Sequence, residues 1–162
     1  MQASNKLLNF IAYWERPGGK PALTAQKSIE DNHYEIGFGH LSDSFFEVKP
    51  DTKINWDFAY TLLAHDVGEA SGLVNRWMRT QGLELIDQNK FDALVDAVYN
   101  GVAIDSGVFR AVARGDTEAV CLELKRWVYA TVDGKKVVLR GLQKRRNAEC
   151  AMYALGDYGH RP

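Results

Sequence analysis

Hydrophobic residues recur every three or four positions along most of the chain, which is the spacing of one face of an α-helix. This spacing predicts a first helix that is capped by Ser4 and ends near Glu15, because the proline two residues later disfavours helix just before it. A long second helix is predicted after Asn55, with apolar positions running from Phe58 to Trp77. A helix of that length can connect two lobes.

The same periodicity predicts further helices in the second half of the chain. We expect them to begin near Asp87, Ser106, Asp116 and Gly141, and to end near Asn100, Ala113, Val128 and Leu155. A turn is expected at Asp133 and Gly134, and a frayed end from Gly156 to Pro162. The core candidates are Phe10, Trp14, Phe91, Leu94, Val98 and Trp127.

Between Gly18 and Gly39 the helical spacing gives way to short runs separated by turn residues. Residues 21–26 and 33–38 read as the two strands of a hairpin, with residues 28–32 as the turn. Alternation along the second strand places Glu35 on the face opposite Ile36 and Phe38. Glu35 then points away from the apolar side, where a cleft can form. A further turn at residues 49–51 closes this lobe.

Composition adds limits on class and location. With 162 residues, 46% hydrophobic and 25% charged, the chain is typical of one globular domain. A formal charge of −1 gives no global reason to bind nucleic acid or an acidic membrane. No apolar run reaches the ~18 residues of a membrane span, and the N-terminus is a poor signal peptide. We therefore expect folding in a cytoplasm and, if the target lies outside, release by a separate route.

The charge is unevenly distributed along the chain. Basic residues gather between positions 125 and 146, where only Asp133 opposes them: Lys125, Arg126, Lys135, Lys136, Arg140, Lys144, Arg145 and Arg146. A solvated helix face is one interpretation of this run. A patch that favours an anionic polymer is the other.

Several kinds of site are disfavoured by spacing. Cys121 and Cys150 lie in helical segments without CxxC spacing, so we expect buried free thiols. The four histidines are scattered, with no HxxxH or HExxH motif, and no metal site or cofactor is expected. The GxSxG motif of serine hydrolases is also absent.

Paired carboxylates remain as candidate chemistry. Glu15 is expected at the negative end of a helix beside Trp14, and both features raise the pKa of a carboxyl group, as a general acid requires. An exposed glutamate at the helix end is the alternative. Glu35, Asp31 and Glu30 compete for the second role. Two such groups suit glycoside hydrolysis, in which one protonates the leaving oxygen and the other activates water or attacks the sugar.

These residues resemble a known family. A helix ending at Glu15, a hairpin, and then Glu35-Ile36-Gly37-Phe38-Gly39-His40 are similar to the phage-type lysozymes, the endolysin muramidases of glycoside hydrolase family 24. The similarity continues through most of the chain. Further segments that resemble the family are Leu62 to Val67, Asn89 to Val95, Lys125 to Ala130 and Gly141 to Glu149.

The resemblance implies an α+β, mainly helical, lysozyme-like fold in one domain, residues 1–162. It consists of a small hairpin lobe (about 15–55) and a larger helical lobe (about 75–155 plus the first helix), joined by the long helix. Glu15 stands at the position of the general acid, and Asn100 where the family presents an amide to sugar. His40 matches the family histidine and is placed to pair with Asp66 as a structural contact.

The activity implied is hydrolysis of the β-1,4 bond from N-acetylmuramic acid to N-acetylglucosamine in bacterial peptidoglycan, causing host lysis. The protein is expected to be a monomer that waits in the host cytoplasm and reaches the cell wall through a membrane lesion such as a holin makes. No nucleic acid partner and no cofactor are implied.

The departures from the family pattern keep other interpretations open. Arg16 and Pro17 follow Glu15 where the family has glycine, and Glu35 replaces its threonine. The family's hairpin aspartate has no clear counterpart, so Glu35 is the candidate second carboxylate, with Asp31 supporting it. The alternatives are a non-catalytic lysozyme-fold protein that binds peptidoglycan or serves in assembly, and a chitinase-like enzyme.

Overall fold

The computed structural model describes residues 1–27, 33–132 and 134–159. The helices within these ranges are α1 (Asn5–Glu15), α2 (Trp56–Thr80), α3 (Gln88–Tyr99), α4 (Gly107–Ala113), α5 (Thr117–Leu124) and α6 (Arg140–Leu155), with a 3-10 turn at Pro17–Gly19. The strands are β1 (Ala22–Lys27), β2 (Tyr34–Gly37), β3 (His40–Leu41), β4 (Tyr129–Val132) and β5 (Lys135–Val138).

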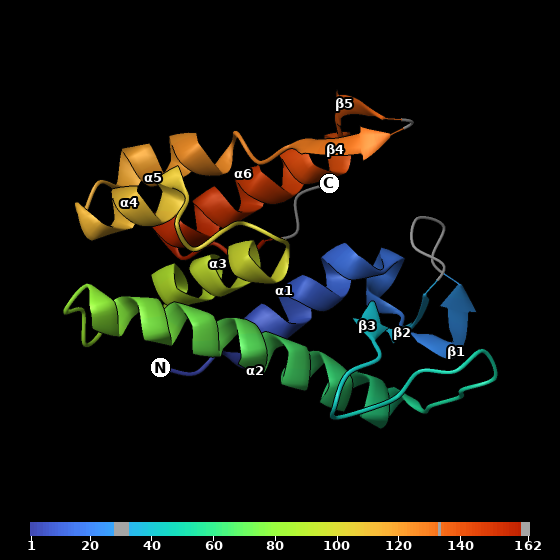
Figure 1. Cartoon of the computed structure of the whole chain (residues 1–162). Helices are drawn as coiled ribbons and strands as arrows, with labels where there is room; N and C mark the ends of the chain where they lie inside the picture. The colour runs from blue at the N-terminus through green and yellow to red at the C-terminus, as the bar shows by residue number, and fades with distance from the viewer. Residues whose placement is uncertain (28–32, 133, 160–162) are drawn as a thin grey trace.

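Two lobes share the long helix α2 (Figure 1). One end of α2 lies beside the small lobe of β1, β2 and β3, and its other end lies in the helical lobe. Helix α3 lies between α2 and α6 and packs against both. The α+β, mainly helical, lysozyme-like fold that the sequence predicts is confirmed.

Side-chain caps fix the starts of the two first helices. The Oγ atom of Ser4 accepts a hydrogen bond from the backbone N–H of Leu7 at 3.2 Å. The Oδ1 atom of Asn55 accepts one from the backbone N–H of Phe58 at 2.8 Å. Both groups satisfy helix N–H donors that have no partner within the helix. Both predicted caps are therefore confirmed.

The core lies where the helices meet. Phe10, Phe91 and Leu94 are fully or almost fully buried in it, as predicted. The other core candidates are only partly buried and pack against its edge: Trp14, Val98 and Trp127. A smaller cluster of Ile36, Val48 and Leu62 attaches the small lobe to α2.

The small lobe is an antiparallel sheet in the order β1-β2-β3. Strand β1 pairs with β2 from Ala22 opposite Gly37 to Lys27 opposite Tyr34. Strand β3 extends the predicted hairpin, pairing Ile36 with His40. With two residues, β3 is too short to show an alternating pattern in the sequence. The predicted turn at 28–32 lies outside the described residues.

The region after α5 corrects the sequence analysis. Helix α5 ends at Leu124 and not near Val128, and the backbone N–H of Trp127 closes a turn onto the carbonyl of Leu124 at 2.9 Å. An antiparallel hairpin, β4 and β5, follows where only a turn was predicted. The missed signal is the run of β-branched residues on each side of an Asp-Gly pair, which favours a hairpin.

The chain end is also ordered further than predicted. The hydroxyl group of Tyr158 donates a hydrogen bond to Oδ2 of buried Asp92 at 2.6 Å. The expectation of a frayed end from Gly156 is therefore wrong as far as residue 159, and the last three residues lie outside the described ranges.

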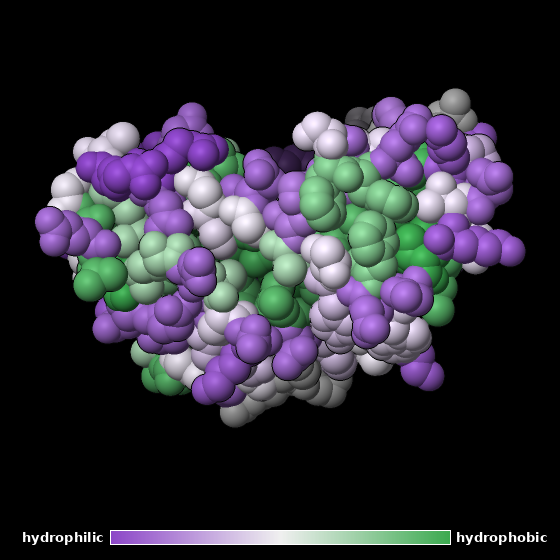
Figure 2. Space-filling model, turned by 90° about the horizontal axis from the view of Figure 1, so that it is seen from below, coloured by the Kyte–Doolittle hydropathy of each residue, from purple (hydrophilic) through white to green (hydrophobic). Residues whose placement is uncertain are grey.

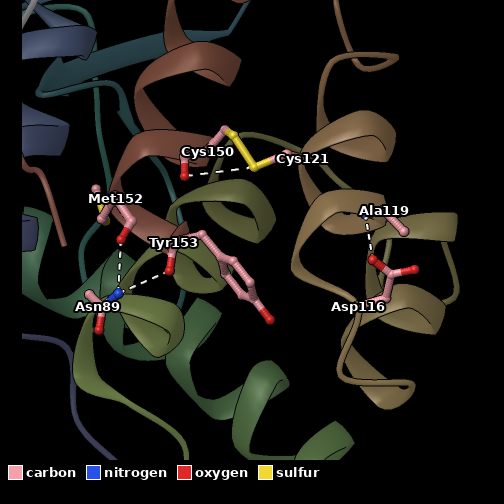
Figure 3. Close-up of a disulfide and its surroundings, with 7 residues drawn as sticks. All are labelled: Asn89, Asp116, Ala119, Cys121, Cys150, Met152 and Tyr153. Carbon is pink, nitrogen blue, oxygen red and sulfur yellow. Dashed lines mark hydrogen bonds between the residues drawn. A yellow bond between two sulfur atoms is a disulfide. The ribbon is translucent and has the colours of Figure 1, made fainter. Parts of the chain in front are cut away.

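The two cysteines form a disulfide, Cys121–Cys150, so the prediction of free thiols is wrong. The bond joins α5 to α6 (Figure 3). The cysteines are 29 positions apart in the sequence with no spacing signal, and only the packing of the two helices brings the sulfur atoms together. In the same region Asn89 donates to the carbonyl groups of Met152 and Tyr153 at the end of α6, at 3.0 and 2.9 Å (Figure 3).

The surface corrects the interpretation of the basic run. Arg145 and Arg146 are 4% and 1% exposed, so they belong neither to a solvated helix face nor to a patch for a polymer. The face seen in Figure 2 is largely hydrophilic, with hydrophobic side chains in separate patches. No helix within the described ranges has the length and hydropathy to cross a membrane.

Candidate active site

A cleft of about 540 Å³ lies where the small lobe meets α2 and α3. This is within the usual range for a small-ligand site. It is bounded by the end of α1, by β2 and the segment after it, and by one side of α2 and α3. The lining residues are Glu15, Glu35, Phe38, Gly39, His40, Leu41, Ser42, Asp43, Asp66, Glu69, Ala70, Leu73, Val98, Tyr99 and Asn100.

Glu15 is the last residue of α1, and its carboxylate faces this cleft. The side chain is 23% exposed, and Nη1 of Arg145 donates a hydrogen bond to Oε1 at 2.6 Å. Gly39 passes close by: a Cβ atom there would lie 4.0 Å from Oε2 of Glu15. Gly39 has φ of +98°, a conformation that favours glycine, so the turn approaches the carboxylate without a side chain.

Arg145 is held in turn by the buried carboxylate of Asp96 on α3. Two hydrogen bonds join them, Nη2 to Oδ1 at 2.7 Å and Nε to Oδ2 at 3.2 Å. Burial lowers the pKa of Arg145, but the charges of Asp96 and Glu15 outweigh burial and raise it. Burial raises the pKa of Asp96, but Arg145 brings it below its ordinary value. Arg145 is therefore a fixed cation beside Glu15. The sequence indicates only Trp14 and the helix end as surroundings of Glu15, and does not reveal this cation.

A second pair of buried side chains lies beside Arg145 on α6. It consists of Arg146, the next residue, and Glu149, one turn further along the helix. Nη2 of Arg146 donates to Oε1 of Glu149 at 2.5 Å and to Oδ1 of Asn100 at 2.7 Å. Burial raises the pKa of Glu149 well above its ordinary value, and the charge of Asp96 raises it further. Because the oxygen of Asn100 is engaged by Arg146, the amide nitrogen is the group that can donate to a ligand in the cleft.

Glu35 enters the same cleft from β2, with a side chain that is 32% exposed. Its Oε1 accepts a hydrogen bond from Nη2 of Arg16 at 2.7 Å. The other arm of Arg16 donates to Oε1 of Gln26 at 2.9 Å. Arg16 is one of the departures from the family pattern, and here it holds the carboxylate that replaces the family's threonine. The competing candidates Glu30 and Asp31 lie outside the described residues.

The predicted pairing of His40 with Asp66 is confirmed. Nδ1 of His40 and Oδ1 of Asp66 lie 2.8 Å apart, which ties the start of β3 to α2. On the opposite wall the hydroxyl group of Tyr99 donates to the carbonyl of Phe38 at 3.3 Å. Burial raises the pKa of Tyr99 and the charge of Glu15 adds to it, so the hydroxyl stays a donor at neutral pH.

Residues 19–149 match the phage lysozyme family. The chain belongs to this family. The matched region begins after Glu15, but the structural similarity includes the first helix. The endolysin from Escherichia coli O157:H7 phage FAHEc1 is 30% identical, with a TM-score of 0.86 over 98% of this chain and 97% of that one.

Two further proteins are similar to this chain in structure or in sequence. The muramidase domain of SpmX from Asticaccaulis excentricus is 25% identical, with a TM-score of 0.80 over 94% of this chain and 97% of that one. An endolysin of Acyrthosiphon pisum secondary endosymbiont phage 1 is 28% identical over 123 residues, which are 74% of this chain and 79% of that one. Family and fold together support a peptidoglycan-degrading lysozyme.

The basic and acidic groups behind the cleft are not evident from the sequence. Arg145 stands within a charged run, and nothing in the sequence singles out Asp96. One signal was present: Arg145 lies in the segment from Gly141 to Glu149 that resembles the family's last helix. Its role becomes visible only when α6 packs against α3 and brings it to Glu15, 130 positions away.

Proposed function

We propose that this protein is a muramidase that hydrolyses the β-1,4 bond between N-acetylmuramic acid and N-acetylglucosamine, with Glu15 as its general acid. The observation that carries the proposal is that Glu15 and Glu35 line one cleft from different elements, in a chain of the phage lysozyme family. Two carboxyl groups on a cleft are the arrangement that glycoside hydrolysis requires.

Each group has a role in this reaction. Glu15 donates its proton to the glycosidic oxygen, and Arg145, 2.6 Å away, orients the carboxyl group and stabilises the carboxylate left behind. Glu35 activates the attacking water or attacks the sugar, and its hydrogen bond from Arg16 holds the carboxylate in the cleft. Asp31 and Glu30 are the alternatives for this second role.

Substrate binding follows from the other walls of the cleft. The amide of Asn100 is placed to donate to a sugar, with Tyr99 beside it. The proposed reaction uses no cofactor. By analogy with relatives that are named endolysins, the biological outcome is lysis of a host bacterium. The protein would then act on the cell wall after a stay in the cytoplasm, with a holin or similar lesion for release.

The direct test is the initial rate of turbidity loss with purified peptidoglycan. We expect Glu15→Gln to lower the rate at least about 100-fold, because general acid catalysis contributes roughly that much. Glu84→Gln is the matched control, since Glu84 is exposed and does not line the cleft. Equal rates for wild type and Glu15→Gln would remove Glu15 from the mechanism. A folded wild type that binds the wall without clearing it would favour the non-catalytic alternative.

A second comparison assigns the second carboxylate. We expect Glu35→Thr with Asp31 intact to retain less activity than Asp31→Ala with Glu35 intact, because Glu35 lines the cleft beside Glu15. The measurement is the initial rate at saturating peptidoglycan for both variants. The reverse ranking would transfer the role to Asp31.

A further inference from the structure

A cluster of titratable side chains at one end of the cleft has no role in the proposed hydrolysis. We call His40, Asp43, His65 and Asp66 the His40 cluster. His40 begins β3, Asp43 follows this strand, and His65 and Asp66 are neighbours on α2. Three of the four line the cleft, so solutes can reach the cluster from solvent.

The buried imidazole of His40 uses only one of its two nitrogens. Its side chain is 2% exposed, and Nδ1 is bound to Asp66 at 2.8 Å. Nε2 is also buried and has no hydrogen-bond partner within the described part of the chain. It faces Oδ1 of Asp43 at 3.7 Å, which is too long for a hydrogen bond. A buried polar atom without a partner is costly, and here it points towards a carboxylate.

Asp43 is fixed in place from its other sides. Its Oδ1 accepts hydrogen bonds from the backbone N–H groups of Phe45 and Phe46, each at 2.8 Å. Its Oδ2 lies 2.9 Å from Nε2 of His65, and the ring of Phe45 stacks on that imidazole with centroids 4.3 Å apart. The carboxylate of Asp43 therefore lies between the imidazole rings of His40 and His65. The contacts with Asp43 and Phe45 also fix the ring of His65.

This arrangement brings together donor types that transition metals bind. A ring nitrogen of His40 and one oxygen from each of Asp43 and Asp66 lie within 4.8 Å of one another. Metal-bound histidines commonly give their second nitrogen to a carboxylate, as His40 gives Nδ1 to Asp66. Imidazole and carboxylate ligands suit Zn²⁺, with metal–ligand distances of about 2.0–2.2 Å.

We propose that the His40 cluster binds a divalent ion of the zinc class. Nε2 of His40 and the carboxylate of Asp43 are its ligands. His65, whose Nε2 lies 2.9 Å from the other oxygen of Asp43, is a further donor, and Asp66 orients the His40 ring. The ion would replace the missing partner of Nε2 and join the segment after β3 to α2. Mg²⁺ and Ca²⁺ fit poorly, because they require mostly oxygen ligands. The sequence contains no metal motif because the two halves of the cluster come from segments more than 20 positions apart.

The test is calorimetric titration of the chelator-treated full chain with Zn²⁺, together with its melting temperature. We expect one ion per chain, a rise in melting temperature with Zn²⁺, and no rise with Mg²⁺. Asp43→Asn keeps the oxygen that accepts from Phe45 and Phe46 but removes the charge, and we expect it to weaken Zn²⁺ binding at least about tenfold. His65→Gln should weaken it as well. Glu47→Gln, an exposed carboxylate on the same segment, is the matched control and should change nothing.

Two results would overturn the proposal. One is the absence of stoichiometric binding by a folded wild type. The other is binding that Asp43→Asn and His65→Gln leave unchanged, which would mean an adventitious ion only, held by a histidine elsewhere such as His33. Neither result depends on hydrolytic activity, so this inference stands or falls independently of the proposed muramidase function.

Discussion

At the residue scale, two buried carboxyl groups behind the cleft, Asp96 and Glu149, have pKa values shifted in opposite directions. Asp96 is ionised because Arg145 binds it with two hydrogen bonds. Glu149 has a pKa raised well above its ordinary value, because burial and the charge of Asp96 both disfavour a second carboxylate. Asp96 is therefore the carboxylate that holds Arg145, and through it Glu15.

This difference predicts unequal costs for two conservative substitutions. Glu149→Gln replaces a carboxyl group that is protonated at low pH by a neutral amide, and we expect it to change the free energy of unfolding at pH 4 by less than about 1 kcal/mol. Asp96→Asn removes the main partner of a buried guanidinium, and we expect a loss of about 3 kcal/mol. Urea unfolding followed by circular dichroism measures both. Equal losses in the two variants would contradict the assignment of charge.

The same assignment predicts a pH dependence. A group whose pKa is raised in the folded state stabilises that state below its unfolded pKa, about 4.3 for glutamate, and the contribution is lost as pH rises towards the folded value. The stability of wild type relative to Glu149→Gln should therefore fall as pH rises above about 4.3. Unfolding free energies of the two proteins at a series of pH values from 4 to 8 test this. A difference that is constant, or that grows with pH, would mean that Glu149 is not the protonated member.

The candidate site was predictable from sequence only where the signal is local. Glu15 stands at a helix end that a cap and a proline delimit, and Glu35 lies in a short strand between glycines. Arg145 and Asp96 reach the site through the packing of α6 on α3, which no spacing in the sequence encodes. In the sequence, Arg16 is visible only as a departure from the family pattern. In the structure, it donates a hydrogen bond to Glu35.

At the element scale, the disulfide is the covalent link between α5 and α6. Cys121 and Cys150 are 29 positions apart in the sequence, and a cross-link over a loop of that length limits the freedom of the unfolded chain. The helices also pack against each other directly, so the bond adds to a contact that exists without it. Such bonds persist in oxidising compartments and not in a reducing cytoplasm.

We therefore expect the reduced protein to fold with the same helices but lower stability. A reducing agent should lower the free energy of unfolding by about 2–4 kcal/mol, and the double variant Cys121→Ala/Cys150→Ala should show a loss of similar size. The double variant is also the control for the reductant, which should have no further effect on it. Wild type that is equally stable with and without reductant would show that the bond contributes little to stability.

The elements themselves were mostly predictable, because helices carry long periodic patterns and capping residues. The errors fall on features of a few residues or on distant pairings. Strand β3 has two residues, the hairpin of β4 and β5 has short strands, and the cysteine pairing depends on two helices coming together. Each of these is decided by neighbours that are not adjacent in sequence.

At the scale of the whole molecule, the two ends of the chain meet at one buried group. Asp92 on α3 is fully buried, and its carboxylate accepts hydrogen bonds from the backbone and hydroxyl of Ser4, from Gln88 and from Tyr158. The start of α1, the start of α3 and the tail after α6 are joined there. The chain end therefore contributes to the helical lobe on which one wall of the cleft is built.

This junction predicts a measurable role for the tail. Tyr158→Phe removes one donor to a buried carboxylate and should lower the free energy of unfolding by about 1.5–3 kcal/mol, the usual range for a hydrogen bond to a charged group. Tyr129→Phe, at an exposed position on β4, is the control and should have little effect. Thermal or urea unfolding of the three proteins gives the comparison. A Tyr158→Phe variant as stable as the control would mean that the tail is only loosely attached.

The central claim is that the cleft between the lobes cleaves a glycosidic bond of peptidoglycan with Glu15 as the acid. Mass spectrometry of the soluble fragments released from purified peptidoglycan, by wild type and by Glu15→Gln, tests it most directly. We expect fragments that end in reducing N-acetylmuramic acid from the wild type and almost none from the variant. Fragments that end in reducing N-acetylglucosamine, or no fragments from a folded wild type that sediments with the wall, would contradict it.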